Sequence, residues 1–184
     1  MQTDEQLIAE YLKGDEHALR SLIERYLRPI YNFVYRYTGE QSHAEEITQD
    51  VFVNVWRNIN RFDPDKKFKT WLFAIAKNTS LNWIKKKRPI NFSRFENEEG
   101  DNVFLESTAD PSPLPSELFE RADLSRKLSE AMGRLSPNYK AVLILHYNEH
   151  MTFQEIAESI GESINTVKSR HRRALTQLKE FLVI

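Results

Sequence analysis

TFQEIAESIGESINTVKSRHRRALTQL, residues 152–178, is the stretch from which the fold of this 184-residue chain can be worked out. Thr152 and Glu155 have the spacing of a capping box, which predicts that a helix begins there. Apolar residues then recur at helical spacing as far as Ile160, and Gly161 follows, where a left-handed residue would end the helix. Ser163 is placed to cap a second helix, so the stretch predicts two short helices joined by a tight turn.

The second predicted helix exposes a polar, basic side. Its apolar positions keep helical period, and the residues left mainly outward are Asn165, Lys168, Ser169, Arg172 and Arg173. Ala157, the turn glycine and Val167 supply the small and branched residues that a close crossing of two helices requires, so we interpret the stretch as a DNA-binding helix-turn-helix. His171 lies near the apolar stripe and is expected to pack rather than contact DNA. The alternative is a helical hairpin with a solvated basic face.

Composition bounds the class of protein. With 40% apolar and 11% aromatic residues, the chain can build cores and is globular. It has no cysteine, which excludes disulfides and thiolate metal sites. The charged N-terminal residues lack the apolar core of a signal peptide, and no apolar run approaches the ~20 residues that a membrane span needs. We therefore expect a cytoplasmic protein with no membrane insertion.

The net charge of −1 conceals a partition along the chain. Residues 1–90 carry a net charge of +3, residues 91–120 carry −7, and residues 121–184 carry +3. The acidic segment also holds Pro111, Pro113 and Pro115, which resist both helix and strand. The prediction is an all-α protein with two small helical domains, 1–90 and 121–184, joined by a flexible acidic, proline-containing linker over 91–120.

The first domain shows helical period throughout. We expect helices over about 4–13, from Asp15 to a stop at Gly39, from a Ser42 cap to about residue 59, and from about Thr70 onward. The third of these has one apolar stripe, and its opposite side is polar and partly acidic. From the residues alone, that polar side is more simply a solvated face than a docking surface.

Residues 66–88, KKFKTWLFAIAKNTSLNWIKKKR, hold eight basic residues and no acidic one. Four aromatic residues are interleaved with the cations, and Asn78, Asn82, Lys85 and Lys86 share one helix face. Proteins bind single-stranded nucleic acid with cations that follow the phosphate backbone and aromatic side chains on which the bases stack. The alternative is that the aromatics belong to the core, which we expect for Phe73 and Trp83 and leave open for Phe68 and Trp71.

These blocks, in this order, resemble the extracytoplasmic-function (ECF) sigma factors of bacterial RNA polymerase. AEEITQDVFVNVW at 44–56 and FKTWLFAIAKN at 68–78 look like the first conserved domain of that family, and LSPNYKAVLILHY at 135–147 with the helix-turn-helix is similar to the second. Asn82, Glu46 and Lys140 depart from the usual residues, which bears only on fine promoter preference.

The resemblance implies partners and site residues for each segment. The core polymerase would dock on Glu45, Glu46, Gln49, Asp50, Asn54 and Trp56. The -10 promoter element, opened to a single strand, would be held by Phe68, Lys69, Trp71, Asn78, Asn82, Lys85, Lys86 and Arg88. The duplex -35 element would be read by Asn165, Thr166, Lys168, Ser169, Arg170, Arg172 and Arg173. An anti-sigma factor is a further partner that the family allows.

Two other classes of protein fit less well. A two-component transcription regulator has a similar helix-turn-helix but needs a receiver domain with strands, and residues 1–90 have helical period. A nucleic-acid enzyme needs a paired-carboxylate or nucleophile constellation, and the sequence offers none. His146 and His150 stand four residues apart without a third metal ligand nearby. We therefore expect no catalysis, no metal and no cofactor.

Overall fold

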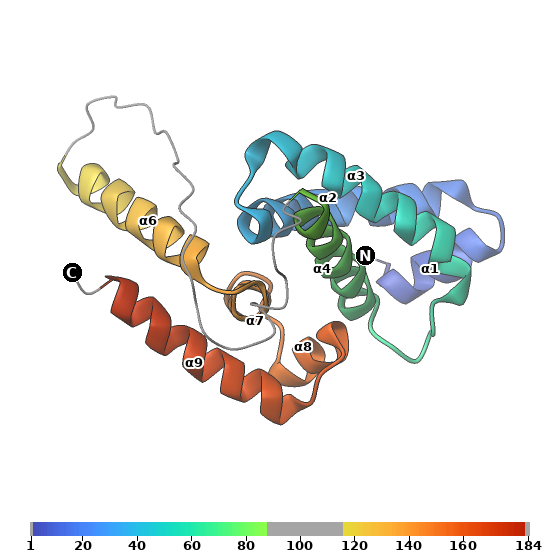
Figure 1. The fold of residues 1–184 in the computed structure, drawn as a ribbon. Coiled ribbons are helices and arrows are strands. Elements are labelled where there is room, and N and C mark those ends of the chain that lie inside the picture. The colour runs from blue at the N-terminus through green and yellow to red at the C-terminus, as the bar shows by residue number, and fades with distance from the viewer. Residues whose placement is uncertain (1, 88–115, 183–184) are drawn as a thin grey trace.

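A computed structural model of the chain describes residues 2–87 and 116–182, and every regular element within these ranges is a helix. Figure 1 shows the first half as a group of helices in blue to green and the second half in yellow to red. The elements of the first half are α1 (Asp4–Leu12), α2 (Glu16–Thr38), α3 (Gln41–Asn58), the 3-10 helix η1 (Ile59–Arg61) and α4 (Phe68–Lys87).

Helices α2, α3 and α4 enclose the core of the first half. The Asp15 side chain accepts from the backbone N–H of His17 to begin α2, and Gly39, left-handed with φ of 75°, ends it. Both ends of α2 are therefore as predicted. The rings of Phe33 and Phe73 meet edge-to-face at 5.4 Å. Of the predicted apolar stripe of α3, Phe52 is half-buried and the other residues are buried, namely Ile47, Val51, Val55 and Ile59.

Two predicted helix starts in this half differ from the observed ones by two residues. Helix α3 begins after Glu40, which makes no side-chain capping bond, and the predicted cap Ser42 instead hydrogen-bonds the His43 ring at 2.9 Å. Helix α4 begins at Phe68 rather than near Thr70. Helix ends fray and are commonly uncertain by one or two residues, so offsets of this size are expected.

The second half contains α6 (Ser116–Arg134), α7 (Pro137–Tyr147), α8 (Phe153–Ile160) and α9 (Ile164–Leu182). Leu135, Tyr139 and Leu143 pack with Ala174 in a small core between α6, α7 and α9. Helix α6 begins at Ser116, so the last five residues of the predicted linker are helical. The rest of that segment, residues 91–115, lies outside the described residues.

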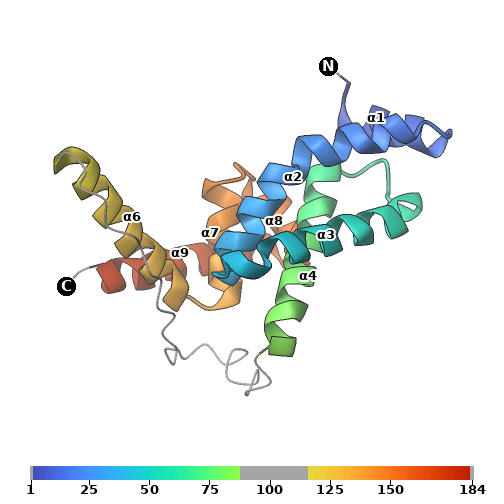
Figure 2. The ribbon, with the colours of Figure 1, turned by 90° about the horizontal axis from the view of Figure 1, so that it is seen from above.

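The two halves pack against each other, as Figures 1 and 2 both show. Helix α8 lies against α4, and α7 lies against α2. One continuous cluster of buried apolar residues runs from the first half into α7, α8 and α9, and its members in the second half include Ala141, Val142, Ile144, Leu145, Met151, Ile156 and Val167. The sequence made no prediction about this arrangement.

Candidate nucleic-acid interface

The helix-turn-helix is built by the local signals that predicted it. The backbone N–H of Glu155 donates to Thr152 Oγ1 at 3.2 Å, and the backbone N–H of Thr152 donates to Glu155 Oε2 at 2.8 Å, which completes the capping box. Gly161 is left-handed, with φ of 72°. The backbone N–H of Thr166 then donates to Ser163 Oγ at 3.1 Å, which caps α9. The capping box, the turn and the second cap are all confirmed.

Helix α9 presents one polar side to solvent. Val167 and Ala174 are fully buried and fix the rotation of the helix, so that Asn165, Lys168, Arg172 and Arg173 are exposed. Thr166 and Ser169 are half-buried beside them. Side chains spaced three and four residues apart on a helix share a face, so Asn165, Lys168, Ser169 and Arg172 form one continuous surface.

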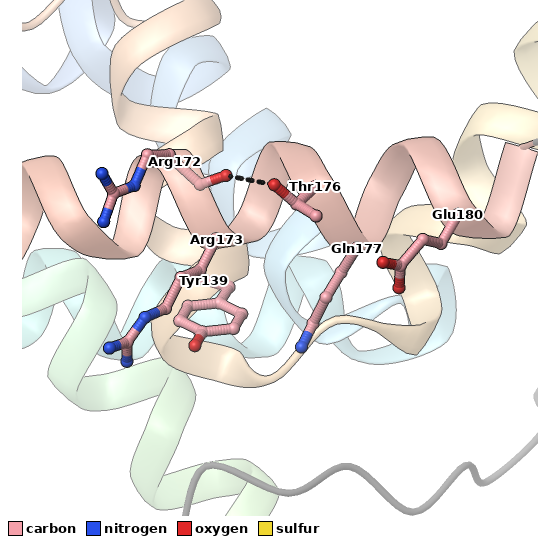
Figure 3. A pocket seen from close by; sticks show the side chains of 6 residues that line it. All are labelled: Tyr139, Arg172, Arg173, Thr176, Gln177 and Glu180. Atoms are coloured by element: carbon pink, nitrogen blue, oxygen red, sulfur yellow. Dashed lines mark hydrogen bonds between the residues drawn. The ribbon is translucent and has the colours of Figure 1, made fainter.

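Figure 3 shows that this surface continues into an open hollow beside α7. The hollow has a volume of about 400 Å³ and is lined by Tyr139, Arg172, Arg173, Thr176, Gln177 and Glu180. In Figure 3 the Arg173 side chain runs beside the Tyr139 ring, whereas the Arg172 side chain lies along the α9 ribbon. Tyr139, Thr176 and Gln177 were not among the predicted site residues. Thr176 follows Arg172 at the i+4 position, so helical spacing could have found it.

Two residues of α9 face away from this surface. The Arg170 guanidinium pairs with the Glu162 carboxylate at 3.0 Å and its side chain is only 20% exposed. His171 packs among His146, Tyr147 and Phe153, with its Nε2 3.1 Å from the Tyr147 hydroxyl. Burial lowers the pKa of His171, and the nearby His146 lowers it further. His171 therefore packs as predicted, whereas Arg170 is held in an ion pair beside the expected DNA surface.

Helix α4 carries a second polar surface. Asn78, Asn82, Lys85 and Lys86 are all exposed and share one side of the helix, as the sequence predicts. No acidic residue interrupts α4 between Phe68 and Lys87. Arg88, which completes the predicted set, lies outside the described residues.

The aromatic residues of this segment are mostly inside the protein. Phe68 is 2% exposed and meets Tyr26 and Phe62 edge-to-face, so its ring packs inside the first half in this structure, and its contact with the -10 element stays a prediction. Trp71 is half-buried and contacts both Phe62 and Phe68. Phe73 is buried and Trp83 is half-buried, as expected for core aromatics.

Helix α3 offers a third surface, which is polar and acidic. Glu45, Glu46, Gln49 and Asp50 are exposed along it, and Trp56 is 57% exposed, unusually high for so large an apolar side chain. Asn54 is different, because its amide donates to Thr79 Oγ1 of α4 at 3.2 Å and it is half-buried. The structure thus brings five of the six predicted polymerase-docking residues to an exposed surface and uses the sixth to join α3 to α4.

Comparisons with known proteins identify the family of the chain. Residues 22–90 match the family model for sigma-70 region 2, and residues 125–178 match that for sigma-70 region 4. The ECF RNA polymerase sigma factor SigW of Bacillus subtilis (strain 168) is 32% identical over 95% of this chain and 94% of its own length. The chain belongs to the ECF sigma factors of RNA polymerase.

Solved structures agree with this family. The fold is similar to that of CnrH, solved with the cytosolic domain of CnrY, with a TM-score of 0.72 at 23% identity over 98% of this chain and 97% of that one. It is also similar to the sigma factor RpoE of Bartonella quintana, solved with the anti-sigma factor NepR, with a TM-score of 0.67 at 25% identity over 90% of this chain and 96% of that one.

As an ECF sigma factor, the protein is a transcription initiation factor and not an enzyme. It binds core RNA polymerase, recognises promoter DNA and directs the start of transcription. Within 2–87 and 116–182, no helix combines the length and the apolar character that crossing a membrane demands.

Proposed function

We propose that the two polar helix surfaces divide promoter reading between them. The surface of α9 around Lys168 and Arg172 contacts the duplex -35 element, and the surface of α4 around Asn78 and Asn82 holds the -10 element as a single strand. The observation that carries this assignment is that each half presents one exposed helix side on which amides and cations gather, and that these two halves are the ones matched by sigma regions 4 and 2.

Strand opening is proposed to rest on capture of an extruded base. Extrusion costs a few kcal/mol and stacking returns about 1 to 3 kcal/mol per base, so a pocket that accepts a flipped base tips the balance toward melting without ATP. With Phe68 buried, Trp71 is the aromatic residue of the predicted set that is only half-buried. The asparagine amides of α4 supply donors and acceptors for base edges.

We further propose that the α3 surface docks on core polymerase. Its four exposed polar residues precede Trp56 along the helix, so the surface combines acidic and amide groups with an exposed aromatic side chain, and aromatic residues are enriched at protein interfaces. The protein then works in the cytoplasm, where a bacterial polymerase transcribes. The relative from Bartonella quintana was solved with an anti-sigma factor, and we propose that a protein of that class also binds this chain.

Reconstituted transcription tests the assignment. Together with core polymerase, the protein should start transcripts from a promoter that it uses in its own cell. Replacing either the -35 or the -10 element of that promoter should reduce the yield of transcript. Substitutions on α9 should make the transcript yield less dependent on the -35 element, and substitutions on α4 should make it less dependent on the -10 element. A protein whose α9 substitutions alter only the response to the downstream element would contradict the division of labour.

A further inference from the structure

The face that joins the two halves is complementary in charge. On the first half, Lys67, Lys69 and Lys77 lie in or just before α4, and Arg36 lies near the end of α2. On the second half, Glu149 lies in the turn before α8, Glu155 in α8, and Glu162 in the turn after it. Cations from one half thus meet carboxylates from the other around the shared apolar cluster.

Two of these contacts are direct. Lys67 Nζ lies 2.6 Å from Glu155 Oε1, and the Lys67 ammonium, together with the backbone N–H of Thr152, lowers the pKa of that carboxyl to about 2. Lys69 Nζ donates to the backbone carbonyl of Glu149 at 2.6 Å and lies 3.9 Å from its carboxylate. The residues in each contact are 88 and 80 positions apart in the chain.

The lysines in these contacts belong to the segment that would hold DNA. Lys69 is one of the residues proposed to bind the -10 element, and Lys67 stands two residues before it, just ahead of α4. An ammonium group that donates to a carboxylate or a carbonyl oxygen cannot give the same N–H bond to a phosphate. The turn before α8 and α8 itself therefore occupy cations that an opened DNA strand would need.

The interface between the two halves also buries charged and polar groups at an energetic cost, and this cost favours its opening. Burial lowers the pKa of Lys77 despite the nearby Glu162, and burial raises the pKa of Glu149 despite the nearby Lys69 and Arg36, so both charged forms are incompletely compensated. Ser159, one turn after Glu155 on the same side of α8, is buried and its hydroxyl has no hydrogen-bond partner. An interface with such groups holds the halves together less firmly than its apolar area alone would suggest.

We propose that the packed arrangement is an autoinhibited state of this sigma factor, in which the α8 region takes the place of DNA on the lysines at the start of α4. Opened promoter DNA and the second half of the chain then compete for Lys67 and Lys69. This inference rests on the proposed -10 role of α4. The apparent affinity of the free protein for single-stranded DNA is accordingly reduced by the fraction of molecules that are open.

A matched pair of full-length variants tests the proposal. The closure variant is Glu149→Gln with Glu155→Gln, and glutamine at 155 keeps the capping box of α8 because it serves at that position as well as glutamate does. The control is Glu24→Gln with Glu130→Gln, which removes the same charge from exposed ion pairs within α2 and within α6. Far-UV circular dichroism establishes that both variants remain helical.

Two measurements then separate closure from DNA binding. Small-angle X-ray scattering without DNA gives the radius of gyration. This radius should be larger for the closure variant than for the parent and the control. For the parent it should also rise between about 0.05 M and about 0.5 M salt, because salt screens the ionic contacts between the halves. Fluorescence anisotropy with a labelled oligothymidine single strand should give at least about threefold tighter binding for the closure variant than for the control.

The outcomes are distinguishable. Equal radii for closure variant and control, with the parent binding the oligothymidine, overturn the autoinhibited state and leave the proposed function intact. A larger radius with no gain in affinity over the control overturns the competition for the lysines. If none of the proteins binds the oligothymidine while the radius still rises, the proposed -10 role fails and closure itself is supported.

Discussion

Glu155 serves two structures at once, because its carboxylate completes the capping box of α8 and also pairs with Lys67 across the two halves. Its pKa is about 2 in the folded protein, below the ordinary value of 4.5, with the hydrogen bond from Lys67 as the first cause and the bond from the Thr152 backbone as the second. A carboxyl whose pKa is lowered by folding contributes stability above its unfolded pKa and loses it as the pH falls toward the folded value.

The first prediction concerns acid stability. The free energy of unfolding of the parent should fall from about pH 5 to about pH 2 more steeply than that of Glu155→Gln, which has no carboxyl to protonate. Urea titrations across this pH range measure the difference. Glu24→Gln, which removes an exposed ion pair with Arg20, should keep the slope of the parent. Parallel curves for the parent and Glu155→Gln would contradict the role of Glu155.

The second prediction separates two neighbouring arginines of α9. Arg172 is exposed on the proposed -35 surface, whereas Arg170 is paired with Glu162. Arg172→Ala should cost about 1 to 3 kcal/mol at one base position if it reads a base edge, or lower the salt slope of binding by about 0.9 if it contacts a phosphate. Arg170→Ala should have the smaller effect in the same duplex titrations. A larger loss for Arg170→Ala would mean that this ion pair opens on DNA.

At the scale of one helix, the third prediction assigns α4 to opened DNA. Asn78→Ala with Asn82→Ala should reduce permanganate reactivity of thymines near the -10 element, because the amides contact bases only after the strands part. Lys85→Ala with Lys86→Ala should instead weaken the closed complex, and its salt slope should be lower by about 0.9 for each phosphate that the protein no longer neutralises. A promoter with a pre-melted bubble should rescue the first variant much more than the second. Normal promoter opening by the asparagine variant would contradict the assignment.

The fourth prediction assigns α3 to the polymerase. Charge reversal by Glu46→Lys with Asp50→Lys should lower affinity for core polymerase, because a polar docking surface loses its complementary charge. Glu24→Lys with Glu130→Lys makes the same charge change on α2 and α6 and should leave that affinity unchanged. Titration of labelled protein with core polymerase measures both. Equal affinities would return this surface to the simpler interpretation of a solvated face.

Local signals predicted the helices better than they predicted which side chains are available. The Thr152–Glu155 capping box and the left-handed Gly161 act within a few residues, and the structure confirms both. Phe68 and Trp71 look alike in sequence, since both are aromatics among lysines. Phe62 packs against both rings, but Tyr26, which is distant in the chain, packs against Phe68, and local sequence does not predict that contact.

At the scale of the whole molecule, the packing of the two halves could not be predicted. The distribution of charge along the sequence indicated two basic modules on either side of an acidic segment. The net charge of a module is an average and does not show where its acidic residues lie. The contacts of Lys67 with Glu155 and of Lys69 with Glu149 depend on a few acidic residues on one side of a net basic half. Periodicity reports which side of a helix is apolar, but not which other helix covers it.

The last prediction uses two adjacent residues of α7 to test that packing. Ile144 belongs to the apolar cluster shared by both halves, whereas Leu143 belongs to the small core between α6, α7 and α9. Both are nearly fully buried, so truncation of either to alanine should destabilise the protein by about 2 to 5 kcal/mol. The two variants should differ in where the loss is felt. Ile144→Ala should also reduce hydrogen-exchange protection in α2 and α4, because those helices share its cluster, and Leu143→Ala should reduce protection mainly in α6 and α9. Identical protection patterns in the two variants would show that the halves do not stabilise one another in solution.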